Sequence, residues 1–130
     1  MRTAYFDCYS GISGNMILGA LLDLGADLSI LEDGLRSLDL GRFEINVTRQ
    51  NKNDISAIYA DVVTSDEVDG RTIADIMAII DRGSLGEDIK GEAKRIFFRL
   101  AEAEAKVHGY QGSQIRLHEV GATDPIIDVV

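Results

Sequence analysis

Two β-rich runs joined by a short polar segment constrain this chain more than any other feature of its sequence. In the run from 42 to 49, apolar and polar residues alternate, which places Phe43, Ile45 and Val47 on one face of a strand. A second β-rich run covers 55–64, and the polar residues 50–54 between the two runs favour a turn. We therefore predict a hairpin with one buried face, and a small sheet of this kind needs helices to cover that face.

Helical patterns lie on both sides of the predicted hairpin. The segments Ser29–Glu32 and Ser84–Glu87 match the capping box that often opens a helix, and Thr72–Asp75 has similar capping residues. Asp124 followed by Pro125 predicts an N-cap and a proline at the first helical position. The predicted helices cover 16–25, 29–38, 72–83, 84–109 and the residues from 124 onward.

Short strands are predicted near both ends of this pattern. Ala4–Phe6 is an apolar run that predicts a buried strand, and 114–117 is long enough for another. The resulting element order is β-α-α-β-β-α-α-β-α. It predicts a single α+β domain over residues 1–130, with two layers, in which a small mixed or antiparallel sheet has helices packed on one face.

Charge and composition exclude several classes of partner. The 130 residues carry a formal net charge of −9, which disfavours nucleic acid and membrane surfaces and favours the capture of cations. The single cysteine, Cys8, fits a reducing compartment, and no apolar run approaches the length of a membrane span, so we expect a cytoplasmic protein. Because Ile126–Val130 is apolar and has no stop signal, we expect the chain to be the amino-terminal part of a longer protein.

The first candidate site is the segment from Tyr5 to Met16. Here the predicted strand ends in Asp7, and a turn of small residues leads into a helix, which is where α/β-type sites are commonly built. Glycines allow the backbone to approach a ligand, and amides at a helix start attract anions. A plain strand-to-helix connection with Ser13 as N-cap is the alternative interpretation. The turn residues predicted to contact a ligand are Ser10, Gly11, Ser13 and Gly14.

The second candidate site lies near the end of the sequence and contains His118, Glu119, Asp124 and Asp128. Asp124 and Asp128 are four residues apart on a predicted helix, so they share a face, and this arrangement is costly without a compensating cation or proton. Imidazole and carboxylate groups are suitable ligands for divalent transition metals. A structural role for the histidine and an N-cap role for Asp124 are the alternatives. Asp128, between two apolar residues, is predicted to be poorly solvated.

Taken together, these segments resemble the nickel-insertion proteins of the lactate racemase system. The resemblance covers 5–16 and 118–124, with Arg71–Ile76 between them. Proteins of that family place nickel in the pyridinium bis-thiocarboxylate mononucleotide, the nickel-pincer cofactor, in a CTP-dependent reaction. The resemblance implies that this chain is the amino-terminal domain and that the nucleotide-binding carboxyl-terminal domain lies outside it.

The resemblance carries over the motif positions Asp7, Ser10, Gly11, Gly14, His118, Glu119, Asp124 and Asp128, and their roles are inferred from their residue types. The cofactor precursor would bind at the Ser10–Gly14 turn through its phosphate, and CTP with a divalent cation would bind mainly in the other domain. The family usually has Asp at the position of Asn15, and many members have a histidine-rich tract where this chain has 65–69. The implied nickel ligands are Asp7, His118, Glu119, Asp124 and Asp128. The implied catalytic residues of this nickel chelatase or cyclometallase, a lyase, are Asp7, His118 and Glu119.

Two other functions remain open from the sequence. A strand that ends in an acid also begins phosphoryl-transfer enzymes, in which Asp7 would attack or orient a phosphoryl group. The apolar end of the chain also favours a non-catalytic assembly domain, and a homo-oligomer is compatible with it.

Overall fold

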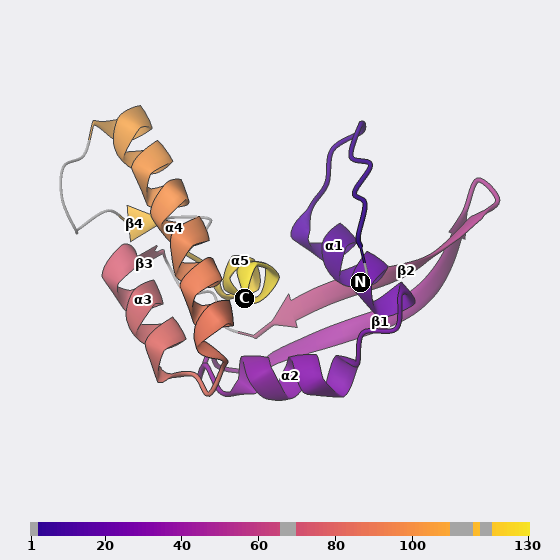
Figure 1. Cartoon of the computed structure of the whole chain (residues 1–130), viewed down its shortest axis with the longest axis horizontal. Coiled ribbons are helices and arrows are strands. Elements are labelled where there is room, and N and C mark those ends of the chain that lie inside the picture. The colour runs from indigo at the N-terminus through magenta and orange to yellow at the C-terminus, as the bar shows by residue number, and fades with distance from the viewer. Residues whose placement is uncertain (1–2, 66–69, 110–115, 118–120) are drawn as a thin grey trace.

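The structure is a computed structural model that describes residues 3–65, 70–109, 116–117 and 121–130. It confirms the α+β class, because helices pack against a two-stranded antiparallel sheet. In Figure 1, α3 and α4 form one side of the molecule, α1 and the hairpin tip form the other, and α5 lies between them above α2. The elements are α1 Gly14–Asp23, α2 Leu28–Arg36, β1 Phe43–Lys52, β2 Ile55–Thr64, β3 Arg71–Thr72, α3 Ile73–Arg82, α4 Glu87–His108, β4 Arg116–Leu117 and α5 Thr123–Val129.

The predicted hairpin is confirmed as β1 and β2, which pair in continuous antiparallel register from Phe43 opposite Thr64 to Lys52 opposite Ile55. The turn is shorter than predicted, because it consists only of Asn53 and Asp54. Their φ angles are 52° and 62°, the left-handed values of the tight turn that suits the twist of a two-stranded hairpin. The two strands therefore extend up to this two-residue turn.

A continuous apolar core joins α2, α3, α4 and α5 to the base of the hairpin. Its largest fully buried members include Phe97 of α4, Ile76 and Ile80 of α3, and Ile126 of α5. The capping box predicted at the start of α3 is present, since the Thr72 and Asp75 side chains each accept a hydrogen bond from the other residue's backbone N–H. The cap fixes where the buried face of α3 begins.

Helix α1 packs separately on β2. A Cβ added at Gly19 would lie 2.4 Å from the carbonyl oxygen of Ile58, so glycine is needed for the helix to approach the strand this closely. Leu18 of α1 is also buried but is not part of the main core. The close approach at Gly19 holds α1 against β2.

The strand predicted at Ala4–Phe6 is wrong. Residues 3–10 form no strand and are exposed, with Tyr5 at 88% and Phe6 at 53% of full exposure. The apolar pattern alone could not form a strand, because the backbone of a strand needs a neighbouring strand for its hydrogen bonds. No strand of the described residues pairs with this segment.

Three helix starts also differ from the prediction. Helix α2 begins one position earlier because Asp27 is its N-cap and accepts from the Ser29 backbone N–H at 2.8 Å. Helix α4 begins at Glu87 without a side-chain cap, and α5 has Ala122 as N-cap in place of Asp124. At α2 two neighbouring residues can serve as N-cap, and α4 and α5 begin without a side-chain cap, so a capping residue in the local sequence does not fix these starts.

The short strands β3 and β4 bring distant parts of the chain together. Strand β4 was predicted within 114–117, whereas β3 was not predicted. The two strands pair antiparallel, with Arg71 opposite Leu117 and Thr72 opposite Arg116. This pairing places the Arg71–Ile76 motif beside the segment that leads into α5. Among the helices of the described residues, none combines the length and apolar character that spanning a membrane requires.

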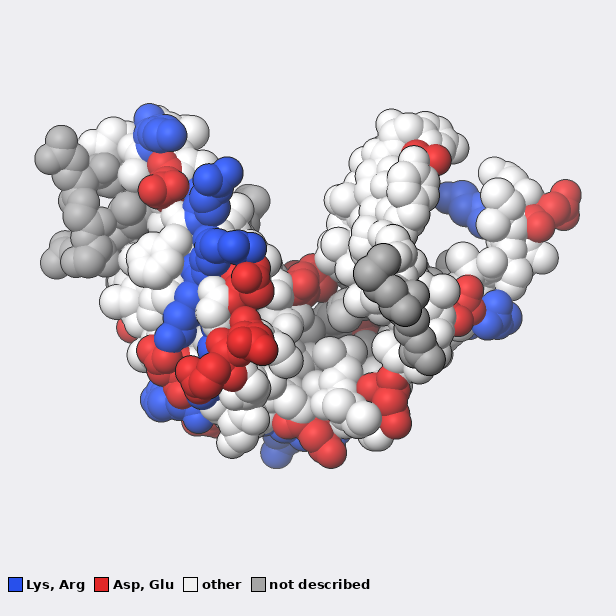
Figure 2. All heavy atoms as spheres, viewed as in Figure 1, with Lys and Arg blue, Asp and Glu red and all other residues white. Residues whose placement is uncertain are grey.

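Figure 2 shows the surface hollowed between the α3–α4 side and the α1 side, in the view of Figure 1. Charges of both signs line the visible face of α4, as expected for a solvated helix face. Ion pairs there include Lys94 with Asp81 and Arg95 with Glu92. Exposed pairs of this kind contribute little to stability individually.

Candidate functional site

The two sequence motifs meet where the start of α1 contacts α5. Ser13 is the N-cap of α1, as predicted, and its Oγ accepts a hydrogen bond from the Met16 backbone N–H at 3.3 Å. Gly14, the first residue of the helix, packs against Asp128 of α5. A Cβ added at Gly14 would lie 2.1 Å from the Asp128 Cγ atom. Only glycine therefore leaves room for this carboxyl group.

The Asp128 carboxyl group is placed in an environment that disfavours its charge. Its Oδ1 atom is buried and has no hydrogen-bond partner in the described part of the chain. Burial, and secondarily the nearby Asp124 carboxylate, raise the pKa of Asp128 above its ordinary value.

This arrangement gives Asp128 two chemical capacities. A carboxyl group with a raised pKa can accept and release a proton closer to neutral pH than an exposed aspartate can. An oxygen without a hydrogen-bond donor also keeps its lone pairs available for a divalent cation, which would neutralise the repulsion with Asp124. The prediction that Asp128 is poorly solvated is confirmed for its Oδ1 atom.

Asn15, the second residue of α1, joins this helix start to the hairpin. Its Nδ2 atom donates a hydrogen bond to the carbonyl oxygen of Ala60 in β2 at 3.0 Å. Ala60 is fully buried and Asn15 is half-buried. Asparagine can donate this bond, whereas an ionised aspartate would place a second acceptor against the carbonyl oxygen.

We expect the substitution Asn15→Asp to lower the free energy of unfolding by about 1–3 kcal/mol at neutral pH, because a part-buried hydrogen bond is replaced by two facing acceptors. The loss should shrink in acid, where a protonated aspartate can donate. Urea unfolding at neutral and acidic pH measures both effects. Asn51→Asp on β1, which is exposed and lies opposite Ser56, is the control, and an equal loss there would show that Asn15 has no special role.

Arg71 holds the start of α5 in place. Its Nη1 atom donates to the carbonyl oxygen of Gly121 at 2.9 Å, and its Nη2 atom donates to Thr123 Oγ1 at 3.2 Å. Burial lowers the pKa of the guanidinium, and the Asp75 carboxylate opposes that shift. A Cβ added at Gly121 would lie 2.1 Å from the carbonyl oxygen of Leu117. Arg71 and Gly121 thus fix the position from which α5 carries Asp128.

Sequence reasoning did not assign these positioning roles. The only hint in the sequence is that the segment Arg71–Ile76 resembles the family, and this resemblance does not indicate what Arg71 does. A hydrogen bond between residues 50 positions apart cannot be inferred from local spacing.

The substitution Arg71→Lys should destabilise the chain by about 1–3 kcal/mol, since one ammonium group cannot reproduce the fork that reaches both acceptors. Chemical denaturation of the two proteins measures the difference. Arg42→Lys is the matched control, because Arg42 is exposed. Equal midpoints for Arg71→Lys and the parent protein would rule out the positioning role.

The other predicted residues are not gathered at the α1–α5 contact. Asp7, Ser10 and Gly11 lie in the exposed segment before α1. The Gly11 backbone N–H donates to the Cys8 carbonyl oxygen at 2.9 Å, and Gly11 has a φ of 89°, so a turn is present as predicted. Asp7 does not end a strand, so the geometry on which the phosphoryl-transfer hypothesis depended is absent.

His118 and Glu119 lie outside the described residues. Asp124 is exposed and in the first turn of α5. Within 3–65, 70–109, 116–117 and 121–130, no three His, Cys, Asp or Glu side chains are grouped closely enough to hold a metal ion. The described residues therefore supply at most part of a metal site, namely Asp128 with Asp124.

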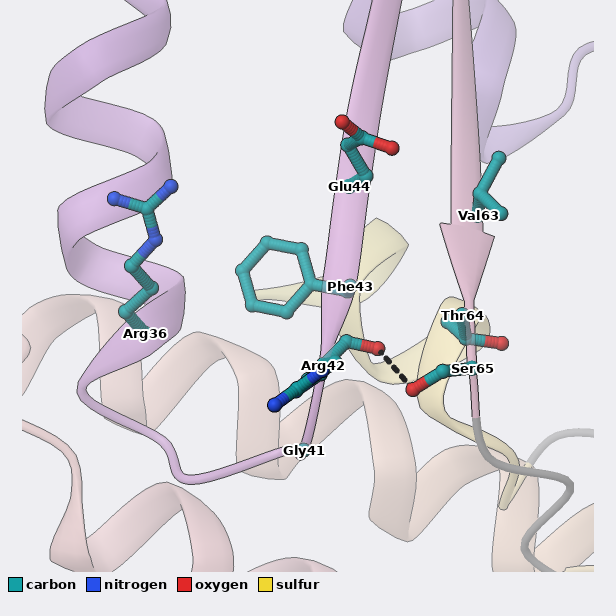
Figure 3. Close-up of a pocket in the computed structure, with 8 residues that line it drawn as sticks. All are labelled: Arg36, Gly41, Arg42, Phe43, Glu44, Val63, Thr64 and Ser65. Carbon is teal, nitrogen blue, oxygen red and sulfur yellow. Dashed lines mark hydrogen bonds between the residues drawn. The ribbon is translucent and has the colours of Figure 1, made fainter.

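A pocket of about 560 Å³ lies elsewhere, where β1 begins and β2 ends (Figure 3). The Ser65 hydroxyl and backbone N–H both donate to the carbonyl oxygen of Arg42, at 3.2 and 3.1 Å, which closes this end of the hairpin. Arg36 faces the pocket from α2 but is paired with Glu32 at 2.9 Å. Among the described residues that line this pocket, none was predicted from the sequence to belong to the site.

Comparison with known proteins gives the family. The nickel insertion protein family matches residues 4–130. Two relatives are named pyridinium-3,5-bisthiocarboxylic acid mononucleotide nickel insertion protein. The relative from Acetivibrio thermocellus is 43% identical to this chain, and the match covers the whole of this chain and 34% of the relative. The relative from Desulfitobacterium hafniense is 44% identical, and the match covers the whole of this chain and 32% of the relative. The chain thus spans about a third of the curated relatives it matches. No solved structure gives a significant match. With 127 of 130 residues inside the family match, this chain belongs to the nickel insertion protein family.

Proposed function

We propose that the full-length protein inserts nickel into pyridinium-3,5-bisthiocarboxylic acid mononucleotide, and that this chain supplies part of the nickel-handling site. The names of the relatives support the reaction. The observation that carries the site is the contact between Gly14 and the Asp128 carboxyl group, which joins the two family motifs. Nickel and the mononucleotide are both substrates in this proposal.

In this proposal Asp128 is the central nickel ligand of the chain. Its unpartnered Oδ1 and its proximity to Asp124 both favour a bound divalent cation. His118 and Glu119 are proposed to complete the ligand set with Asp124, whereas Asp7, also predicted as a ligand, lies in the exposed segment before α1 and is left out of this set. The Ser10–Gly14 turn receives the phosphate of the mononucleotide at the amino end of α1, where the helix dipole favours an anion.

The reaction also needs a base. When nickel bonds to a ring carbon, the carbon–hydrogen bond breaks and its proton must pass to that base. Because a carboxylate that coordinates nickel is a weak base, Asp128 holds the metal in this proposal, and whichever of His118 and Glu119 does not coordinate nickel accepts the proton. We assign the protein on this basis to the lyases, as a nickel chelatase or cyclometallase.

The remaining two thirds of the full-length protein would bind CTP with its divalent cation, as the resemblance implies. The partner of this chain is then its own carboxyl-terminal domain. An exposed free thiol, Cys8, suits the reducing conditions of the cytoplasm, where we place the protein.

The test is nickel titration by calorimetry and a nickel-insertion assay, both on the full-length protein. The double variant His118→Ala, Asp128→Ala is expected to lose nickel binding and insertion together. Asp33→Asn is the control, because the Asp33 side chain is 81% exposed on α2 and has only a 3.9 Å contact with Arg36. Nickel affinity and insertion that are unchanged in the double variant would remove the site assignment.

A further inference from the structure

An apolar groove of about 320 Å³ lies where α2, the loop before α4 and the end of the chain meet. Its walls include Ile30 and Leu31 of α2, Leu85, Ile89 of α4, and Val130. Ile30 is 71% exposed and Ile89 is 47% exposed, so the groove presents large apolar side chains to solvent. An apolar groove of this kind marks a surface that another segment covers.

The position of Val130 indicates which segment this is. Val130 is the C-cap of α5 and lines the groove itself, and its backbone N–H donates to the Ile126 carbonyl oxygen at 3.1 Å, so the last helical hydrogen bond of α5 reaches the groove. In Figure 1 the carboxyl end lies above α2 and beside the lower part of α4.

The relatives supply the length of chain that this segment requires. The whole of this chain aligns with only 34% of the Acetivibrio thermocellus protein, so most of a full-length family member lies outside it. We propose that the residues following Val130 in the full-length protein continue α5 as a helix and pack its apolar face into the groove between α2 and α4. Apolar residues are then expected at i+3, i+4 and i+7 counted from Val130.

Site-specific photo-crosslinking in the full-length protein tests the proposal. With Ile30→p-benzoylphenylalanine, or with Ile89→p-benzoylphenylalanine as a second probe if the first disturbs folding, irradiation should join the groove to the peptide that directly follows Val130 in the same polypeptide. Ile55→p-benzoylphenylalanine is the matched control, because Ile55 is also 71% exposed but lies at the hairpin tip. It should give no crosslink to that peptide.

Mixing isotopically labelled and unlabelled protein distinguishes the possible occupants. Crosslinks confined to a single isotope support the continuing segment. Crosslinks between the isotopes would show that a second copy fills the groove, and crosslinks to a remote segment, or none from either probe, would show that the continuing helix does not. Any of these last three results, namely crosslinks between the isotopes, crosslinks to a remote segment, or no crosslink from either probe, overturns the proposal.

Discussion

Replacing Asp128 with asparagine is expected to stabilise the fold at neutral pH while weakening nickel binding to the full-length protein by more than about 10-fold, the smallest loss typical of changing even an outer-shell partner of a ligand. Burial and Asp124 raise the pKa of Asp128 above its ordinary value of 3.8, so the unfolded chain loses this proton at a lower pH than the folded chain. The stability contributed by the protonated group is therefore complete below pH 3.8 and declines as the pH rises through the raised pKa. Because asparagine does not ionise, the Asp128→Asn protein does not lose this stability as the pH rises.

Urea unfolding across this pH range measures the first effect, and nickel calorimetry measures the second. The difference in unfolding free energy between Asp128→Asn and the parent protein should grow as the pH rises above 3.8. Asp33→Asn should show neither effect. A loss of stability at neutral pH in Asp128→Asn would show that the ionised carboxylate is a structural group, and the nickel assignment would then lose its main support.

The substitution Gly14→Ala should reduce stability by about 1–3 kcal/mol, because the new methyl group would overlap the Asp128 carboxyl group at 2.1 Å and force α1 and α5 apart. Adding Asp128→Ala to Gly14→Ala should recover part of the loss. A double-mutant cycle by chemical denaturation measures this coupling. The change in unfolding free energy of the double variant should differ clearly from the sum of the changes in the two single variants, as expected for residues in direct contact.

Gly91 provides the control for this prediction. It lies inside α4, and a Cβ added there would meet no atom within 4 Å. Gly91→Ala should therefore stabilise the chain by about 0.5–1 kcal/mol, as alanine does in an open helical position. If Gly14→Ala were as stable as Gly91→Ala, the Gly14–Asp128 contact would not exist in solution.

The elements that the sequence predicted best are those whose pattern is complete within one segment. The hairpin follows from the alternation of Phe43, Ile45 and Val47, and α3 follows from its capping box. The segment 4–6 failed because strand formation depends on a partner that local pattern cannot supply. Strand β3 was missed because two residues carry no periodic signal, and its pairing with β4 is set by contacts distant in sequence.

For the candidate site, the sequence indicated the residue types and the structure decided which of them meet. Asp128 and Gly14 were both predicted, but neither spacing nor composition gave their contact. Asp7 was predicted beside them and instead lies in an exposed segment. The role of Arg71 in holding α5 was found only in the structure, since its acceptors follow it by about fifty residues.

The sequence by itself determined the α+β class, the hairpin, most helices and the family motifs, because these depend on side-chain periodicity, capping residues and local composition. Only the tertiary structure decided that the first turn of α1 faces the carboxyl group of α5, and that an apolar groove remains open beside Val130. The physical reason is that the repulsion between Asp124 and Asp128 follows from their spacing along one helix, whereas the contact of the Asp128 carboxyl group with Gly14 comes from the packing of segments more than a hundred residues apart, which no local pattern encodes.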